Sequence, residues 1–354
     1  MSEAEENVII EEFYVFEEES KNMFLDFPKN LYSDKEYFQD YETEKAIIEG
    51  RHSLNHDFEV HFFLALNKNR EPLARAMLTF YHNDPNAYVG YFDCINNTSV
   101  GVLFLKQLKQ YANNKLCNRL VGPYNCSWWI SKGMKIEDFG KPVYSEPYNL
   151  PYYQQIFINA GFQPIKKYST YTYNKTIKED KYQGKTVPME TYVSQGLKIV
   201  NFEEKTYENQ ISQALKLLLN VPVNDPFYKR INEKEFYELN PKLKETMSYK
   251  YSKLFYNNQN QLVGFYIAVP DYSNYLIQEY IMKTNMVKTL QSELVVPFFA
   301  ANPNIKGFDL SMKDYMRKDI GNKVRFDIFG ISEDNLYYYK DTIDKKINYI
   351  LYAL

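Results

Sequence analysis

The sequence contains few of the residues that form disulfides or hold metal ions. Its three cysteines, Cys94, Cys117 and Cys126, are an odd number in a chain of 354 residues and lack metal-ligand spacing. We therefore expect free thiols in a reducing compartment. Two of the four histidines, His52 and His56, are four residues apart, but they lack the glutamate of a zinc-binding helix, so we expect no metal.

Positive charge and long apolar runs are also scarce. The formal net charge is −3 and the pI is about 6.0, so the composition indicates neither nucleic acid nor an acidic membrane as a partner. No apolar run reaches membrane-spanning length, and residues 1–6 are acidic, unlike a signal peptide. These features favour a cytoplasmic protein. The motifs of serine hydrolases and P-loop proteins are absent.

The sequence does contain a repeated order of secondary-structure signals. Strands predicted at 60–66 and 72–81 form a hairpin, and the same pattern recurs at 251–256 and 261–269. The first hairpin is followed by a strand at 87–95 and a helix at 98–113. The second is followed by a strand at 275–282, a helix at 285–300 and a strand at 306–312. We therefore expect an α/β chain made of two similar domains.

Other segments set the expected domain limits. A polar stretch at 177–196 predicts a linker between an N-terminal domain (1–176) and a C-terminal domain (197–354), which opens with a helix at 207–220. Residues 3–20 are expected to form an edge strand or a short helix with a solvated acidic face. Pro28 is expected in a turn, before a helix at 37–48.

The stretch from Arg119 to Phe162 carries a family resemblance. It contains Gly122-Pro123-x-Asn125, then Tyr148-Asn149-x-Pro151-Tyr152-Tyr153, and finally Ala160-Gly161-Phe162. This order resembles the C-terminal half of the GNAT superfamily of acyl-CoA-dependent N-acyltransferases, and in particular a bacterial subgroup with a Gly-Pro loop at this place. The resemblance extends back to residue 24 and forward to about residue 175. It implies two tandem GNAT-like domains, each a mixed, mostly antiparallel sheet flanked by helices.

The resemblance also implies acetyl-CoA or another acyl-CoA as a substrate. In GNAT enzymes a Gln/Arg-x-x-Gly-x-Gly/Ala loop before a helix surrounds the pyrophosphate, which backbone amides at the helix start can bind. The corresponding loop keeps one glycine, Gly101. Two interpretations stay open: an altered CoA loop, or an ordinary helix start capped by a hydroxyl. The candidate cofactor-binding residues in this loop are Asn97, Thr98, Ser99, Val100 and Gly101.

Candidate catalytic residues come from the same resemblance. The GNAT general acid is commonly a tyrosine four residues before the glycine of a terminal Gly-Phe, and this position is Phe157, which cannot transfer a proton. Tyr152 and Tyr153, upstream, can either protonate the departing thiolate or cover an edge of the core. Asp93 is the first candidate for a general base and Glu146 the second. Asn125 and Asn149 can orient an amide or the pantetheine chain, or serve in turns.

Three functions remain open from the sequence. The first is an N-acyltransferase acting on a small-molecule or peptide amine, with the chemistry in the N-terminal domain. The second is a catalytically inactive GNAT-fold protein that binds a ligand or partner through the loop of Trp128 and Trp129. The third is similar to Fem-type transferases, which use aminoacyl-tRNA, although the chain lacks a basic patch. Acyl transfer requires a cleft where two central strands separate, and packed side chains there would argue against it.

Overall fold

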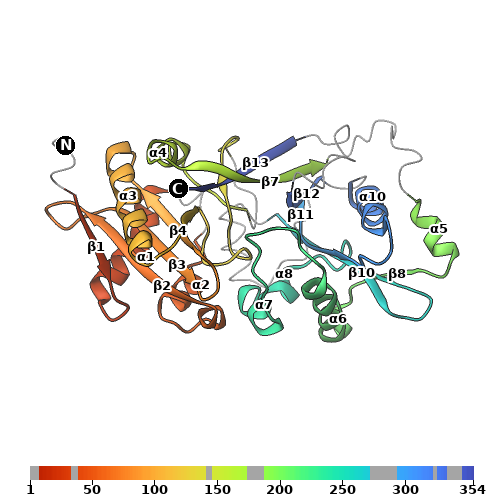
Figure 1. Ribbon diagram of the computed structural model, residues 1–354. Coiled ribbons are helices and arrows are strands. Elements are labelled where there is room, and N and C mark those ends of the chain that lie inside the picture. Colours follow the sequence, from red (N-terminus) through yellow and green to blue (C-terminus); the bar gives the residue numbers. More distant parts are fainter. Residues whose placement is uncertain are drawn as a thin grey trace. The chain divides into compact units, whose positions relative to one another are not determined.

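The computed structural model describes residues 8–32, 39–140, 146–173, 187–271, 293–321, 325–332 and 345–354 (Figure 1). These residues form two compact units. The first unit holds the described residues up to Tyr168 together with Asn348–Leu354, and the second holds those from Ser169 to Ile347. The expected division placed the last residues of the chain in the C-terminal domain, whereas Asn348–Leu354 belong to the first unit because they pair with its strands.

The first unit is built on a mixed sheet with the strand order β1-β2-β3-β4-β5-β13. All neighbouring strands are antiparallel except β4 and β5, which are parallel. The strands are β1 (Ile9–Phe13), β2 (Phe58–Leu66), β3 (Pro72–Tyr81), β4 (Asn86–Cys94), β5 (Arg119–Gly122) and β13 (Lys345–Ala353), with a short β6 (Met134–Lys135) beside β13 and the start of β7 (Gln163–Tyr173). The helices are α1 (Glu18–Leu31), α2 (Tyr41–Ile48), η2 (Ser53–His56), α3 (Thr98–Asn114) and α4 (Tyr153–Asn159).

Alternate residues of the first sheet face two different helical layers. Phe63 and Ala76 belong to an apolar core that includes Phe104 and Leu108 of α3 and Ile156 of α4. On the other face, Phe62 packs against Phe24 of α1, with ring centroids 6.1 Å apart. This period of two along the strands is the expected pattern for a sheet covered on both faces.

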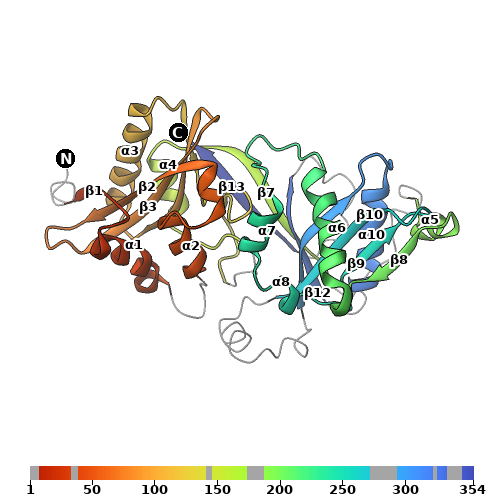
Figure 2. The same cartoon turned by 90° about the horizontal axis from the view of Figure 1, so that it is seen from below.

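The second unit repeats this arrangement with the strand order β12-β11-β10-β9-β8. The strands β11 and β12 are parallel and the other pairs are antiparallel. Helices α6 and α10 lie on opposite faces of this sheet (Figures 1 and 2). The elements are α5 (Met189–Ser194), β8 (Lys198–Asn201), η3 (Glu204–Thr206), α6 (Tyr207–Asn220), α7 (Glu233–Leu239), α8 (Leu243–Thr246), β9 (Lys253–Tyr256), β10 (Leu262–Pro270), β11 (Glu293–Ala301), α10 (Phe308–Gly321) and β12 (Arg325–Ser332).

The structure confirms the α/β class and both predicted hairpins, which are β2–β3 and β9–β10. The helix predicted at 207–220 is α6 with the same bounds, and that predicted at 98–113 is α3. Residues 3–20 supply the edge strand β1, followed by the start of α1. The strand predicted at 275–282 lies outside the described residues.

Three predictions were wrong in the second half of the chain. The helix predicted at 285–300 is the strand β11 over its described part, because a continuous apolar run suits a doubly covered strand as well as a helix. The strand predicted at 306–312 lies in the loop before α10 and in its first turns, where Phe308, Met312 and Met316 recur every four residues and are buried. Part of the expected linker forms α5, whose Met189 is buried.

Pro28 lies inside α1 and not in the expected turn. A proline in a helix leaves the carbonyl four residues earlier without its usual donor. That carbonyl belongs to Phe24, and the buried Arg75 of β3 donates a hydrogen bond to it from Nη1 at 2.8 Å. A long-range side-chain contact therefore compensates for the proline and lets the helix continue.

Candidate functional site

Both units contain a central strand that separates from its parallel neighbour close to a bulge. In the first unit the β3–β4 register shifts between the pairs Arg75/Asp93 and Met77/Gly90, and β4 pairs with β5 only over residues 86–88. In the second unit the β10–β11 register shifts between the pairs at Ile267 and Val269, and β11 pairs with β12 over residues 293–296. The predicted acyl-CoA cleft requires two central strands that separate, and in each unit this is where they do so.

In the first unit the loop after β5 lies directly against the free edge of β4. The Tyr124 amide donates to the carbonyl of Val89 at 2.8 Å, and the Asn125 side chain accepts from the Tyr91 amide at 2.7 Å. Tyr91 has a φ of 47°, rare for an aromatic residue, and this hydrogen bond holds the bulged backbone there. A Cβ on Gly90 would lie 2.7 Å from the Cα of Asn125, so the two segments are in close contact.

The two candidate tyrosines at the start of α4 contact the end of β4. The Tyr153 hydroxyl accepts from the amide of Cys94 at 3.0 Å, and the Tyr152 hydroxyl donates to the carbonyl of the same residue at 2.6 Å. Phe157, one turn later, is buried against Phe92, with ring centroids 5.1 Å apart. Side chains of the protein therefore use the backbone groups of β4 along the edge that would line a cleft.

Asp93 lies in a buried charged network rather than in an open site. Its carboxylate accepts from the hydroxyls of Tyr32 at 2.8 Å and Tyr153 at 3.2 Å, and from Nε of Arg75 at 2.7 Å. Arg75, fully buried, also donates to Glu44 through Nη1. Burial raises the pKa of Tyr153 well above its ordinary value, and the nearby Asp93 raises it further. The network joins two tyrosines to a central strand and leaves the Tyr153 proton on its oxygen.

The start of α3 is an ordinary capped helix terminus. The Asn97 side chain accepts from the amide of Val100 at 3.2 Å, and Val100 itself is buried. Gly101 packs against α4, since a Cβ there would lie 2.6 Å from Cγ2 of Ile156. The glycine therefore allows two helices to approach, and of the candidate loop only Thr98 and Ser99 are exposed.

The remaining candidates from the sequence hold loops in place. The Asn149 side chain accepts from the amide of Lys135 at 2.8 Å and donates to its carbonyl at 3.2 Å, so it pairs with β6 like a strand. Glu146 accepts a short hydrogen bond from the hydroxyl of Tyr349.

Trp128 and Trp129 are half-buried with their rings in an edge-to-face arrangement at 5.5 Å. The ammonium of Lys132 lies 3.4 Å from the centre of the Trp128 ring, a cation–π contact. Trp128 therefore packs against Lys132, a residue of the same loop.

The second unit has a different loop at the corresponding place. Residues 302–307 connect β11 to α10 and end in Gly307, which has a φ of 76°. Nothing lies within 4 Å of a Cβ built on Gly307, so this glycine faces open space. Lys306, next to it, is exposed. Sequence reasoning missed this loop because it placed the helix of the second domain too early. The four-residue spacing of the apolar residues in α10, directly after a glycine, was the available signal.

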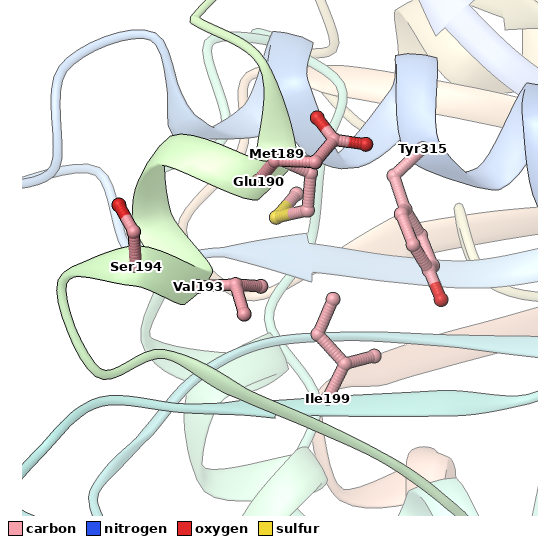
Figure 3. Close-up of a pocket in the computed structure, with 6 residues that line it drawn as sticks. All are labelled: Met189, Glu190, Val193, Ser194, Ile199 and Tyr315. Carbon is pink, nitrogen blue, oxygen red and sulfur yellow. The ribbon is translucent and has the colours of Figure 1, made fainter.

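A separate pocket lies further along α10 in the same unit, with a volume of about 340 Å³. Figure 3 shows that Met189 and Val193 of α5 and Ile199 of β8 surround it, with the ring of Tyr315 of α10 at one side. Glu190 and Ser194 complete its lining. None of the candidate residues from the sequence lies in this apolar pocket.

The described residues give no sign of a metal site or a membrane span. Within them, no group of three or more histidine, cysteine, aspartate or glutamate side chains is arranged to hold a metal ion. None of the helices in this part of the chain is long and apolar enough to cross a bilayer. The ring of His52, one of the spaced pair, accepts from the amide of Leu54 at 3.2 Å as a cap of η2.

Comparison with known proteins shows the fold. No protein-family model and no curated protein matches the sequence. A tandem GNAT protein from the clavulanic acid biosynthesis pathway, solved without acetyl-CoA, is similar over 98% of both chains, with a TM-score of 0.54 and 8% identity. A GCN5-related glucosamine N-acetyltransferase region of a fungal multi-domain beta-N-acetylglucosaminidase is similar over 98% of this chain and 38% of its own, with a TM-score of 0.56 and 9% identity. With its two bulged, helix-covered sheets, this chain has the tandem GNAT fold.

Proposed function

We propose that this protein is an acyl-CoA-dependent N-acyltransferase whose acyl-CoA site is in the second unit, at the loop 302–307 and the start of α10. The observation that carries the proposal is Gly307, which has left-handed backbone and faces open space at a helix start. The loop follows a strand that separates from its parallel neighbour close to a bulge. The GNAT fold supports an acyltransferase in general, and the site is our inference.

The start of α10 offers backbone amides to a diphosphate, although the Phe308 amide already donates to the carbonyl of Ile305 and the first turn also carries the acidic Asp309. The first amides of a helix have no partner within the helix, and they carry a partial positive charge. A glycine beside them allows the backbone to approach the ligand closely. Lys306 adds a full charge at the same end of the helix. The start of α3 in the first unit lacks this combination, because its Gly101 packs against Ile156.

The reaction that we propose transfers the acyl group from the sulfur of acyl-CoA to the nitrogen of a small-molecule or peptide amine. The amine attacks the thioester carbonyl and the carbon–sulfur bond breaks. The nitrogen loses one proton as it becomes an amide, and the departing thiolate takes up one proton to leave as the CoA thiol, so the reaction balances. Positioning of the two reactants and polarisation of the carbonyl supply most of the rate in such chemistry.

We place the protein in the cytoplasm, since Cys94, Cys117 and Cys126 are free thiols.

A second candidate is a GNAT-fold protein that binds partners without catalysis. One observation favours it: in the first unit, the backbone of β4 is hydrogen-bonded to Tyr124, Asn125, Tyr152 and Tyr153 along the edge beyond β5. A unit that uses these groups internally does not offer them to a pantetheine chain. If the second unit also fails to bind acyl-CoA, this function replaces the first.

Thermal unfolding with and without acetyl-CoA separates the two functions. Binding at a hundred times the Kd stabilises a native protein by about 2.7 kcal/mol, which raises its melting temperature by a few degrees. We expect this shift for the wild type, and loss of most of it for Lys306→Glu. Lys106→Glu, on an exposed position of α3, is the matched control and should keep it.

Three results would redirect the proposal. Absence of any shift with the wild type would favour the non-catalytic function. Loss of the shift in Ser99→Glu but not in Lys306→Glu would move the site to the first unit. If acetyl-CoA binds but no CoA thiol is released with any of a panel of primary amines, the protein binds this ligand without acting as a transferase.

A further inference from the structure

Lys313 lies in the second turn of α10, and its side chain reaches both the start of this helix and β11. Its ammonium is 3.8 Å from Oδ2 of Asp309 in the first turn and 5.4 Å from the centre of the Phe299 ring on β11. Phe299 lies beyond Val296, the last residue of β11 that pairs with β12 among the described residues. The amine therefore lies between the two features on which the proposed acyl-CoA site depends, the helix start and the separated strand.

The surroundings of Lys313 stabilise its positive charge poorly. The side chain is only 15% exposed. An ammonium has three N–H donors, and an N–H···O hydrogen bond is normally no longer than about 3.2 Å. The contact with Asp309 is longer than this, and the part of the chain that the structure describes contains no hydrogen bond from this ammonium.

These surroundings favour the neutral, nucleophilic amine. Burial lowers the pKa of Lys313, and attraction to Asp309 opposes this change only in part. A lysine becomes a nucleophile when its amine is desolvated, because only the unprotonated nitrogen has a free lone pair. Lys318 of the same helix provides a reference: its side chain is 51% exposed, and its ammonium is 2.8 Å from Oδ2 of Asp314. Lys313 is thus the better nucleophile of the two.

We propose that Lys313 is a modification site, whose amine accepts the acyl group of an acyl-CoA bound at the start of α10. This inference rests on the proposed function. The neutral amine attacks the thioester carbonyl, a carbon–nitrogen bond forms and the carbon–sulfur bond breaks. The nitrogen loses one proton and the departing thiolate takes up one proton, so the products are an Nε-acyl-lysine and the CoA thiol.

The acylated side chain suits this position better than the charged one. Burial of a neutral amide costs much less than burial of an ammonium, and the methylene groups can stay against Phe299. The contact that is lost, with Asp309, is already longer than a hydrogen bond. The Asp309 side chain is 51% exposed, so its carboxylate remains hydrated, and the amine beside it lies close enough to solvent for a thioester to reach it.

Peptide mass spectrometry of the full chain after incubation with acetyl-CoA tests the proposal, because it gives the acetylation rate of each lysine. We expect Lys313 to react at least about tenfold faster than Lys318, an advantage well within what the positioning of two reactants supplies. S-acetyl-N-acetylcysteamine, a thioester without the diphosphate, should acetylate Lys313 more slowly than acetyl-CoA does at the same concentration. A lysine that only covers Phe299 with its methylene groups would react no faster than Lys318.

Variants connect the modification to the proposed site. Lys313→Arg keeps the charge but has no amine to acylate, so the chain should lose its fast acetylation. Lys318→Arg is the matched control on the same helix and should keep it. Lys306→Glu, which should weaken acetyl-CoA binding, should slow the acetylation of Lys313 to the rate with the small thioester.

The thermal shift of the wild type with acetyl-CoA separates this inference from the proposed function. If acetyl-CoA raises the melting temperature but Lys313 reacts no faster than Lys318, the inference is wrong and the proposed function stands. If neither the shift nor the fast acetylation occurs, both are wrong. Fast acetylation that persists in Lys306→Glu would show that the acyl group does not come from acyl-CoA bound at the start of α10, and would also overturn the inference.

Discussion

The role of Gly101 as a packing residue leads to a quantitative prediction. In Gly101→Ala, the added Cβ would lie 2.6 Å from Cγ2 and 2.8 Å from Cδ1 of Ile156. Overpacking of this kind costs about 1–3 kcal/mol, while replacing glycine by alanine in a helix returns up to about 1 kcal/mol. We therefore expect a net loss of about 1 kcal/mol in the free energy of unfolding, measured by urea denaturation followed by circular dichroism.

A double-mutant cycle separates the clash from the helix propensity. Ile156→Ala removes the contacting atoms and by itself costs about 2–5 kcal/mol. In that background Gly101→Ala should no longer destabilise, so the coupling energy should be at least about 1 kcal/mol. Gly307→Ala is the control: nothing lies near its Cβ, and it should cost about 1–2 kcal/mol from its left-handed backbone alone, without coupling to Ile156. Coupling below about 0.5 kcal/mol between Gly101 and Ile156 would refute the packing role.

Two further predictions concern the buried network of the first unit. Tyr153→Phe should lower the free energy of unfolding by about 1–3 kcal/mol, because the amide of Cys94 loses its acceptor and Asp93 loses a donor; urea denaturation measures it, and an unchanged stability would show that the hydroxyl is dispensable. Arg75→Met should cost about 3–5 kcal/mol at about pH 8, because two buried carboxylates lose their partner. Burial raises the pKa of Glu44, which makes protonation in mild acid easier, so the deficit should shrink at about pH 5, and a deficit independent of pH would contradict this account.

Local signals predicted the elements whose pattern is unambiguous. The helix α6 combines an apolar face with a clear end, and the hairpin turns at 67–70 and 257–260 are rich in asparagine between apolar strands. The strand β11 was missed because its apolar residues are continuous, a pattern that fits a buried strand or a buried helix equally well. The repeated order of predicted strands and helices indicated two similar domains. Only the resemblance to GNAT proteins indicated which fold each domain has.

The sequence could not predict that several candidate residues form hydrogen bonds within the protein. Asn125 was a candidate ligand residue, yet its side chain accepts from the amide of Tyr91, which is 34 positions away. Arg75 compensates for a proline in α1 through a hydrogen bond that joins residues 51 positions apart. Such contacts join residues that are far apart in the sequence, and no local pattern of residue types predicts them.

The two glycines show why the same motif search gives different answers in the two units. Gly101 matches the position of a cofactor-loop glycine in sequence, but the space beside it is filled by Ile156. Gly307 matches no complete motif, but it combines a positive φ with open space at the start of a long helix. A glycine supports ligand binding only where the space that its missing side chain leaves is open to the ligand. By that physical criterion the second unit, and not the first, retains the condition for binding a diphosphate, and the acetyl-CoA shift of Lys306→Glu against Ser99→Glu decides whether it does.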